Sequence, residues 1–146
     1  MNIFFDTSVL VAASVSSHIH HLQARPTLER VIAKKDRGFI GAHSIAEAFS
    51  ALTRIPVVPR IHPSEATRIV EENLLPYFEI ISLDKRDYLR AMNLTADGGW
   101  VGGKIYDALL LCCAAKVSPD RVYTFNVSNF QLLSPAFLKS KISAPR

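Results

Sequence analysis

The sequence has only two cysteines in 146 residues and no C-x-x-C pair, so a zinc site or redox motif built on cysteine is not expected. Cys112 and Cys113 are neighbours in the sequence. Because neighbouring residues on a helix point about 100° apart, the two thiols are poorly placed to bridge each other. We expect two free thiols buried in a helix.

Long apolar runs and a basic leader are missing as well. The longest apolar stretch, Ala108 to Ala115, is far shorter than a membrane span. The chain opens directly on a strand-like stretch, without the basic residues and apolar core of a signal peptide. We therefore expect a cytoplasmic protein that has no membrane partner.

A glycine-rich phosphate loop is the third absence. The stretch Asp97 to Gly103 is dense in glycine, but it does not match GxGxxG and does not follow a predicted strand. A dinucleotide-binding loop is therefore excluded.

The composition that remains is that of a globular protein, with 49% hydrophobic and 21% charged residues. The length suits one domain covering residues 1–146. The formal net charge of +4 is compatible with a nucleic-acid partner, but it does not establish one by itself.

Strand-like and helix-like stretches alternate along the chain. The predicted strands are Ile3–Phe5, Phe39–Gly41, Phe78–Leu83 and Arg121–Asn126. One predicted helix starts at Val9, and a second runs from Leu22 to a C-cap at Gly38, with Pro26 either kinking it or beginning a new helix. The others cover Ser44–Arg54, Ser64–Glu72, a segment capped by Asp84, and Ala108–Ala115. The tail should form one short final element. This alternation predicts an α/β fold with a mainly parallel central sheet of four to five strands and helices on both faces.

Asp6 follows the first predicted strand directly, and Thr7 and Ser8 offer hydroxyls to cap the next helix. A carboxylate at the carboxyl end of a first parallel strand lies where open α/β sheets bind their ligands. The alternative is that Asp6 is only an N-cap. Because two other capping side chains are available, we favour a functional carboxylate.

Two further carboxylates fall in first helical turns. Glu47 follows Ser44 at the spacing of a capping box, so a cap and an active-site carboxylate are equally compatible with the pattern. Asp107 precedes an all-apolar helix, where a charge is costly against the core. For Asp107 we favour a paired or metal-bound carboxylate over a cap.

The expected sheet brings these groups to one edge. Asp6 and Asn126 would end strands there, and the helical turns that carry Glu47 and Asp107 can face the same edge. Three carboxylates at one place repel one another unless a cation neutralises them. Oxygen ligands without thiols select Mg²⁺ or Mn²⁺. Such sites typically hydrolyse phosphodiester bonds with water.

Four motifs together resemble the PIN-domain ribonucleases, and among them the VapC-like toxins of toxin–antitoxin pairs. The motifs are Ile3–Leu10, Ser44–Arg54, Gly103–Ala108 and Thr124–Phe130. The resemblance covers nearly the whole chain and implies a three-layer PIN-like fold. It also implies a Mg²⁺- or Mn²⁺-dependent endoribonuclease, the toxin of a type II system, that hydrolyses RNA with a metal-activated water. A homodimer and a small antitoxin that covers the site are implied in the same way.

The resemblance also implies roles for individual residues. Asp6, Glu47 and Asp107 would form the acidic constellation, with Asp6 and Asp107 as the direct metal ligands. Ser8 and Thr124 would support them through hydroxyl hydrogen bonds.

The fourth motif departs from the family pattern. Relatives commonly carry an aspartate one residue before the phenylalanine, where this chain has Asn129, whereas Asn126 matches the usual asparagine. An amide can hold a metal-bound water but supplies no charge and no base, so Asn129 puts a second metal position in doubt. This keeps an alternative open, a degenerate PIN domain that binds RNA or a protein partner without cleaving.

Basic and aromatic residues near the motifs are candidates for RNA contacts. Arg54 and Lys104 are expected nearest to the proposed pocket and are predicted to contact phosphates. Trp100 or Tyr106 is a candidate for stacking on bases, although a core role is equally compatible with the sequence.

Two other chemistries fit less well. His18, His20 and His21 invite a zinc site, but no matching set of ligands follows, and a loop or helix start is favoured. Aspartyl-phosphate phosphotransferases of the haloacid-dehalogenase type also begin with a strand and an aspartate. They need a second aspartate two residues further on, where this chain has Ser8.

Overall fold

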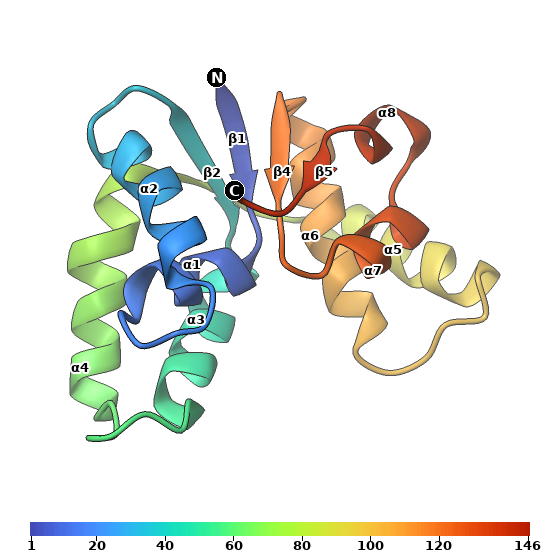
Figure 1. The fold of residues 1–146 in the computed structure, drawn as a ribbon. Coiled ribbons are helices and arrows are strands. Elements are labelled where there is room, and N and C mark those ends of the chain that lie inside the picture. The colour runs from blue at the N-terminus through green and yellow to red at the C-terminus, as the bar shows by residue number, and fades with distance from the viewer.

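Strand β1 (Asn2–Phe5) lies at the centre of a five-stranded sheet with the order β3-β2-β1-β4-β5 in the computed structural model, which describes residues 1–146 (Figure 1). Every neighbouring pair of strands is parallel. The other strands are β2 (Arg37–Gly41), β3 (Phe78–Ile81), β4 (Arg121–Tyr123) and β5 (Ile142–Ser143). The predicted parallel α/β sheet is confirmed, and β5 is the short element expected in the tail.

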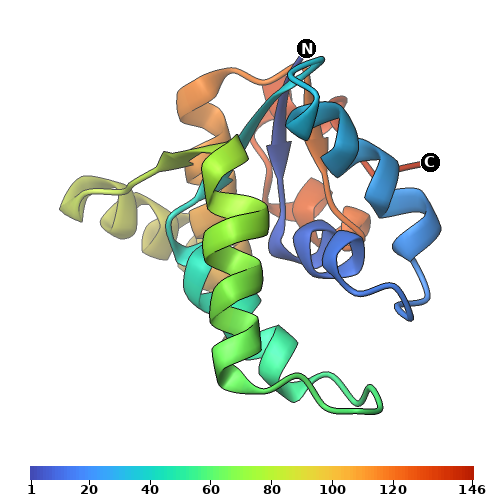
Figure 2. The same ribbon diagram turned by 90° about the vertical axis from the view of Figure 1, so that its left-hand side faces the viewer.

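Helices cover both faces of this sheet, as predicted. Helices α1 to α4 gather on one side and α5 to α8 on the other, as Figures 1 and 2 show. The helices are α1 (Thr7–Ser14), α2 (His21–Ile32), α3 (His43–Arg54), α4 (Pro63–Arg68), α5 (Lys85–Asp97), α6 (Lys104–Val117), α7 (Val127–Leu133) and α8 (Ala136–Lys139). No helix has the length and apolar character that crossing a membrane requires.

The central strand is buried on both faces because its side chains alternate between two cores. Ile3 and Phe5 pack with α1 to α4, whereas Phe4 packs with Leu110 and Phe130 on the other side. All five of these side chains are at most 1% exposed. A strand buried in this way reads as a continuous apolar run, which is why its position could be predicted.

The ends of the strands differ from the prediction for a reason that the register explains. β1 ends at Phe5, which pairs with Tyr123, and β2 ends at Gly41, which pairs with Ile81. Because the partner strands stop there, β4 and β3 end earlier than the predicted boundaries Asn126 and Leu83. A parallel strand cannot continue without a neighbour to accept its hydrogen bonds.

The prediction of a C-cap at Gly38 was wrong. Helix α2 ends at Ile32, and Gly38 lies inside β2. A β-carbon at this position would lie 2.6 Å from the Phe78 ring and 2.9 Å from Val31, so the glycine permits close packing rather than a helix end. Pro26 also neither breaks α2 nor begins a new helix, because α2 continues through it.

One further helical prediction was incomplete and another was confirmed. The helix predicted to end at Glu72 ends as an α-helix at Arg68 and continues as a π-helix, η1 (Ile69–Leu74), and a 3₁₀ turn, η2 (Leu75–Tyr77), up to β3. Asp84 caps α5 as predicted, in a capping box with Asp87.

The two cysteines are free, as predicted, and lie on α6. Cys113 is buried, whereas Cys112 is only partly so. Burial raises the pKa of the Cys113 thiol to about 12, which keeps it protonated and unreactive at neutral pH.

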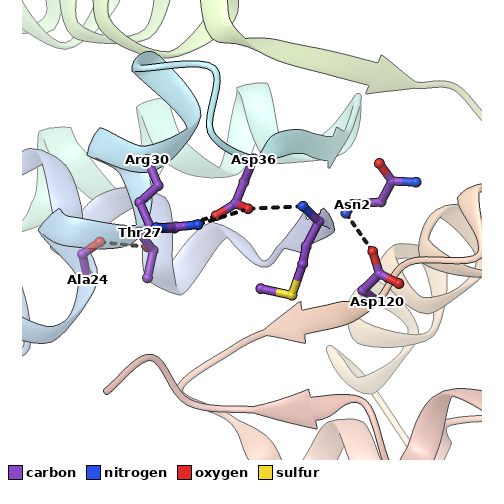
Figure 3. Close-up of polar contacts among 7 residues, drawn as sticks. Asn2, Ala24, Thr27, Arg30, Asp36 and Asp120 are labelled. Atoms are coloured by element: carbon purple, nitrogen blue, oxygen red, sulfur yellow. Dashed lines mark hydrogen bonds and ion pairs between the residues drawn. The ribbon is translucent and has the colours of Figure 1, made fainter.

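A buried ion pair joins the end of α2 to the start of β1 (Figure 3). Asp36 is 5% exposed, and its carboxylate accepts hydrogen bonds from Arg30 Nε at 2.6 Å and from the Met1 amine at 3.0 Å. The hydrogen bond from Arg30 is the main reason that the pKa of Asp36 lies below its usual value. This contact fixes the chain at the amino edge of the sheet, opposite to Asp6.

We expect Asp36→Ala to lower the free energy of unfolding by about 2 kcal/mol at pH 7, the usual size for hydrogen bonds to a buried charged group. Because the folded pKa of Asp36 is lowered, this stability is present above the ordinary carboxyl pKa and is lost as the pH falls through the lowered value. Urea unfolding at pH 7 and in acid measures both effects. Asp97→Ala, an exposed control, should change stability by less than about 0.5 kcal/mol. Equal losses for both variants would contradict the assignment.

Candidate active site

Asp6 lies between β1 and α1, at the carboxyl end of the central strand. Its backbone amide donates a hydrogen bond of 2.9 Å to the Tyr123 carbonyl, which ties it to the end of β4. Its backbone occupies the N-cap position of α1, but its side chain makes no capping hydrogen bond. The N-cap alternative therefore does not explain the carboxylate. Thr7 and Ser8 are not caps either, because they are the first residues of α1.

Two hydroxyls hold the Asp6 carboxylate. Ser8 Oγ and Thr124 Oγ1 each donate to Asp6 Oδ2 at 2.7 Å. The Phe125 amide donates to Ser8 Oγ at 3.2 Å, and the Asn126 amide donates to Thr124 Oγ1 at 2.9 Å. The segment after β4 thus orients both hydroxyls toward Asp6. Ser8 and Thr124 lie where the family resemblance places them, while Asn126 contributes its backbone amide and has an exposed side chain.

One oxygen of Asp6 remains open. Both hydroxyls donate to Oδ2. Oδ1 accepts no hydrogen bond from a side chain, although the backbone amides of Thr7 and Ser8 lie near enough to the carboxylate to lower its pKa. Asp6 as a whole is only 4% exposed. Desolvation raises the pKa of Asp6 against the lowering effect of the Ser8 and Thr124 hydroxyls. A carboxylate with one fixed and one open oxygen can accept a cation.

Glu47 faces the same site from α3. Thr7 Oγ1 lies 2.9 Å from Ser44 Oγ and 3.3 Å from Glu47 Oε1, which connects the first turn of α1 to the amino-terminal part of α3. Glu47 lies beyond the first turn of α3, which begins at His43, so the prediction that it falls in a first turn was wrong. The N-cap of α3 is Ala42, and no side chain caps this helix. The capping-box alternative for Ser44 and Glu47 is therefore wrong. Burial raises the pKa of Glu47, the charge of His43 lowers it, and the charge of Asp6 raises it further.

Asp107 completes the acidic group. It lies in the first turn of α6, whose N-cap is Gly103, and no side chain caps the helix. The pKa of Asp107 is raised to about 6, first by burial and then by the negative charges of Asp6 and Glu47, while Lys104 lowers it. The three predicted carboxylates therefore share one electrostatic environment, although they come from distant parts of the chain.

The chemistry of this donor set fits a hard divalent cation. Nowhere in the chain do three or more His, Cys, Asp or Glu side chains converge closely enough to form a ready metal cage. Asp6, Glu47 and Asp107 thus interact through their charges without closing around one point. Mg²⁺ suits such an open site, because it binds through one or two carboxylates and keeps several of its waters.

Lys104 and Asn129 form a contact at the edge of the acidic group. Lys104 Nζ donates a hydrogen bond to Asn129 Oδ1, joining α6 to α7. Since Lys104 also lowers the pKa of Asp107, it faces the carboxylates as predicted. The Asn129 amide oxygen therefore already accepts a hydrogen bond from the Lys104 ammonium group.

Arg54 lies at the last position of α3 and lines a cavity of about 400 Å³. Thr7, Ser8 and Glu47 line the same cavity, so Arg54 is next to the acidic site, as predicted. Trp100, in contrast, packs against the core formed with α6 and α7. This packing supports the core role of Trp100.

His43 is a site residue that the sequence analysis missed. Its ring stacks on the Tyr106 ring with centroids 5.2 Å apart and planes 8° apart. It lies four residues before Glu47 on α3 and lowers the pKa of that carboxyl. This spacing was the signal that could have found it, because residues four apart share one face of a helix.

Comparison with known proteins agrees with this geometry. The family model described as PIN domain matches residues 3–130. Ribonuclease VapC27 of Mycobacterium tuberculosis is 30% identical over 111 residues, which cover 76% of this chain and 75% of that protein. Ribonuclease VapC40 of the same species is 31% identical over 105 residues, 72% of each chain.

Solved structures show the same fold at lower identity. Mycobacterium tuberculosis VapC20, a sarcin–ricin loop cleaving toxin, aligns with a TM-score of 0.65 at 18% identity over 85% of this chain and 89% of that chain. VapBC2 from Rickettsia felis, bound to a DNA fragment from its promoter, aligns with a TM-score of 0.66 at 17% identity over the full length of both chains. This chain therefore belongs to the PIN-domain family, as the motifs around Asp6, Glu47 and Asp107 predicted.

Proposed function

We propose that this protein is a divalent-metal-dependent endoribonuclease that hydrolyses RNA phosphodiester bonds. The observation that carries the proposal is the geometry at the carboxyl end of β1, where Ser8 and Thr124 hold the Asp6 carboxylate and Glu47 and Asp107 lie close enough for their charges to interact with it. Electrostatic repulsion among carboxylates is relieved when the site binds a cation, which can in turn bind a phosphate. The named activity of the VapC27 and VapC40 relatives supports the same conclusion.

Asp6 and Asp107 are the residues that would hold Mg²⁺ or Mn²⁺. Asp6 offers its open Oδ1, while Ser8 and Thr124 fix the other oxygen. When bound, the cation supplies positive charge for the phosphate oxygens and makes water a better nucleophile near neutral pH.

Glu47 would orient the attacking water and accept its proton. Its raised pKa brings it closer to the working range of a general base, and Thr7 holds one of its oxygens. Lys104 and Arg54 would contact phosphates of the RNA on either side of this group, and Asn129 keeps Lys104 in place.

We further propose that the protein is the toxin of a type II pair, acts in the cytoplasm as a homodimer, and is inhibited by a small antitoxin. The support for the partner is the fold likeness to VapBC2 and to FitAB, structures of complexes bound to DNA fragments. The homodimer rests on the family resemblance alone.

Asp6→Asn should reduce RNA cleavage in Mn²⁺ by roughly 100-fold or more, because it removes a direct metal ligand. Glu47→Gln should also reduce the rate, with less effect on the Mn²⁺ concentration required. A fluorescent RNA substrate measures both variants. Asp97→Asn, an exposed aspartate at the end of α5, serves as the control and should cleave normally.

Two results would defeat the nuclease proposal. One is wild-type protein that cleaves no RNA in Mn²⁺, and the other is an Asp6→Asn variant that cleaves as fast as the wild type. RNA affinity that is equal in EDTA and in Mn²⁺, without cleavage, would instead establish the binding-module alternative.

Metal binding should also change the melting temperature of the protein. The folded pKa of Asp107 is raised from 3.8 to about 6, so its contribution to stability is present below pH 3.8 and is lost as the pH rises through 6. In EDTA, Asp107→Asn should therefore melt at a higher temperature than the wild type at pH 7.5 and show no such advantage at pH 4.

Mn²⁺ should reverse this order at pH 7.5. A concentration of about 100 times its dissociation constant should raise the wild-type melting temperature by roughly 5–10 °C, and that of Asp107→Asn by much less. Differential scanning fluorimetry measures both comparisons. The assignment is wrong if the variant gains as much from Mn²⁺ as the wild type does.

Asn129→Asp should lower the Mn²⁺ concentration needed for half-maximal cleavage several-fold. The substitution replaces a neutral amide with a carboxylate that pairs with Lys104 and adds negative charge near Asp107. Asn93→Asp, on the exposed surface of α5, is the matched control for an added charge. An unchanged Mn²⁺ requirement would mean that Asn129 does not limit metal binding.

A further inference from the structure

A cavity of about 400 Å³ opens beside the acidic site. Thr7, Ser8 and Glu47 form the wall that it shares with that site. This volume lies in the range of small-molecule pockets in proteins. The rest of its wall includes two aromatic rings that the proposed cleavage chemistry does not use, together with Arg54.

The first of these groups is a stacked pair of rings. His20, from the loop between α1 and α2, stacks on Phe125, from the segment after β4, with centroids 4.4 Å apart and planes 16° apart. Both rings line the cavity and both are partly exposed. Flat aromatic surfaces of this kind are the platforms on which single-stranded nucleic acids stack their bases.

Hydrogen bonds fix the platform relative to the carboxylates. The Phe125 amide donates to Ser8 Oγ, the same hydroxyl that holds Asp6. On the other side, the His20 amide donates to His18 Nδ1 at 3.0 Å. In addition, a ring nitrogen of His21 lies 2.8 Å from the carbonyl oxygen of Ala12 on α1. The loop that carries His20 is therefore anchored.

The second group is a cation. Arg54 lines the cavity from the end of α3, and its guanidinium carries a permanent positive charge. No acidic side chain pairs with it in an ion pair. An unpaired guanidinium on a pocket wall matches a phosphate group in charge and in hydrogen-bonding geometry.

We propose that this cavity is a nucleotide subsite, in which the His20–Phe125 pair stacks on a base and Arg54 binds a phosphate of the RNA strand next to the cleaved bond. The proposal rests on the nuclease function proposed above and names the residues that position its substrate. A basic peptide fits less well, because its charge would meet that of Arg54.

Binding of a fluorescein-labelled oligoadenylate of eight nucleotides tests the proposal. The Asp6→Asn background in EDTA prevents cleavage, so that anisotropy reports affinity alone. His20→Ala, Phe125→Leu and Arg54→Gln should each raise the dissociation constant about tenfold, within the range known for base–aromatic stacking and phosphate contacts. Phe125→Leu retains apolar volume against the core, so it tests stacking if His20→Ala disturbs the loop.

Matched controls lie elsewhere on the surface. Tyr88→Leu removes an exposed ring on α5, and Arg121→Gln removes an exposed guanidinium at the amino end of β4. Both should bind the oligonucleotide like the parent protein. In the otherwise wild-type protein, His20→Ala should raise KM for RNA cleavage and leave kcat unchanged.

Abasic substitution identifies the contact itself. In a series of oligoadenylates that each carry one abasic nucleotide, binding to the parent protein should weaken when the missing base is at one particular position. At that position, removal of the base should cause no additional loss of affinity in Phe125→Leu. Equal affinities for the parent and all three pocket variants would overturn the proposal, as would a parent that binds no oligoadenylate. Pocket variants that lose only a protein partner would assign the cavity to that partner.

The outcome is separable from that of the nuclease proposal. A protein that binds the oligoadenylate through this pocket but cleaves no RNA in Mn²⁺ would keep the subsite and defeat the catalytic assignment. If the protein cleaves RNA in Mn²⁺ and the pocket variants behave like the parent, the catalytic assignment is kept and the subsite is defeated.

Discussion

A carboxylate held almost out of water at the end of the central strand is the feature on which the rest of the site depends. Burial raises the pKa of Asp6, and the Ser8 and Thr124 hydroxyls oppose that effect by donating to a single oxygen. The arrangement keeps a charge available where hydration is poor and leaves its other oxygen open. The charge of Asp6 raises the pKa of both Glu47 and Asp107, and the charge of Glu47 raises that of Asp107 as well.

The sheet order explains why Asp6 and Glu47 meet. Asp107 joins them from α6, which follows α5 and not a strand. β1 lies between β2 and β4, so the loops after all three strands leave the same edge of the sheet. Those loops lead to α1, α3 and α7, which carry Asp6 at an N-cap, Glu47 near a first turn and Asn129. Parallel strands place ligand-binding groups at their carboxyl ends for this reason. The same edge also receives the stacked His20–Phe125 pair and Arg54, so that acidic and basic surfaces lie side by side.

Sequence reasoning was most accurate where local pattern and tertiary packing agree. The apolar run of β1 predicted a strand buried on two faces because both of its faces pack against helices. The sequence-based predictions failed where a residue is explained by its contact with a residue far away in the sequence. Gly38 resembles a helix cap in sequence, but it is small because the Phe78 ring lies against it. Ser44 and Glu47 have the spacing of a capping box, but both face Thr7 on another helix.

The sequence alone determined the alternating α/β architecture and singled out Asp6, Glu47 and Asp107 as candidates, because periodicity and residue type are local properties. Only the tertiary structure decided how those carboxylates interact, that Lys104 engages Asn129, and that His20 lies on Phe125. These contacts join segments far apart in the chain. Their distances depend on the strand register and helix packing of the whole domain, which no local pattern records.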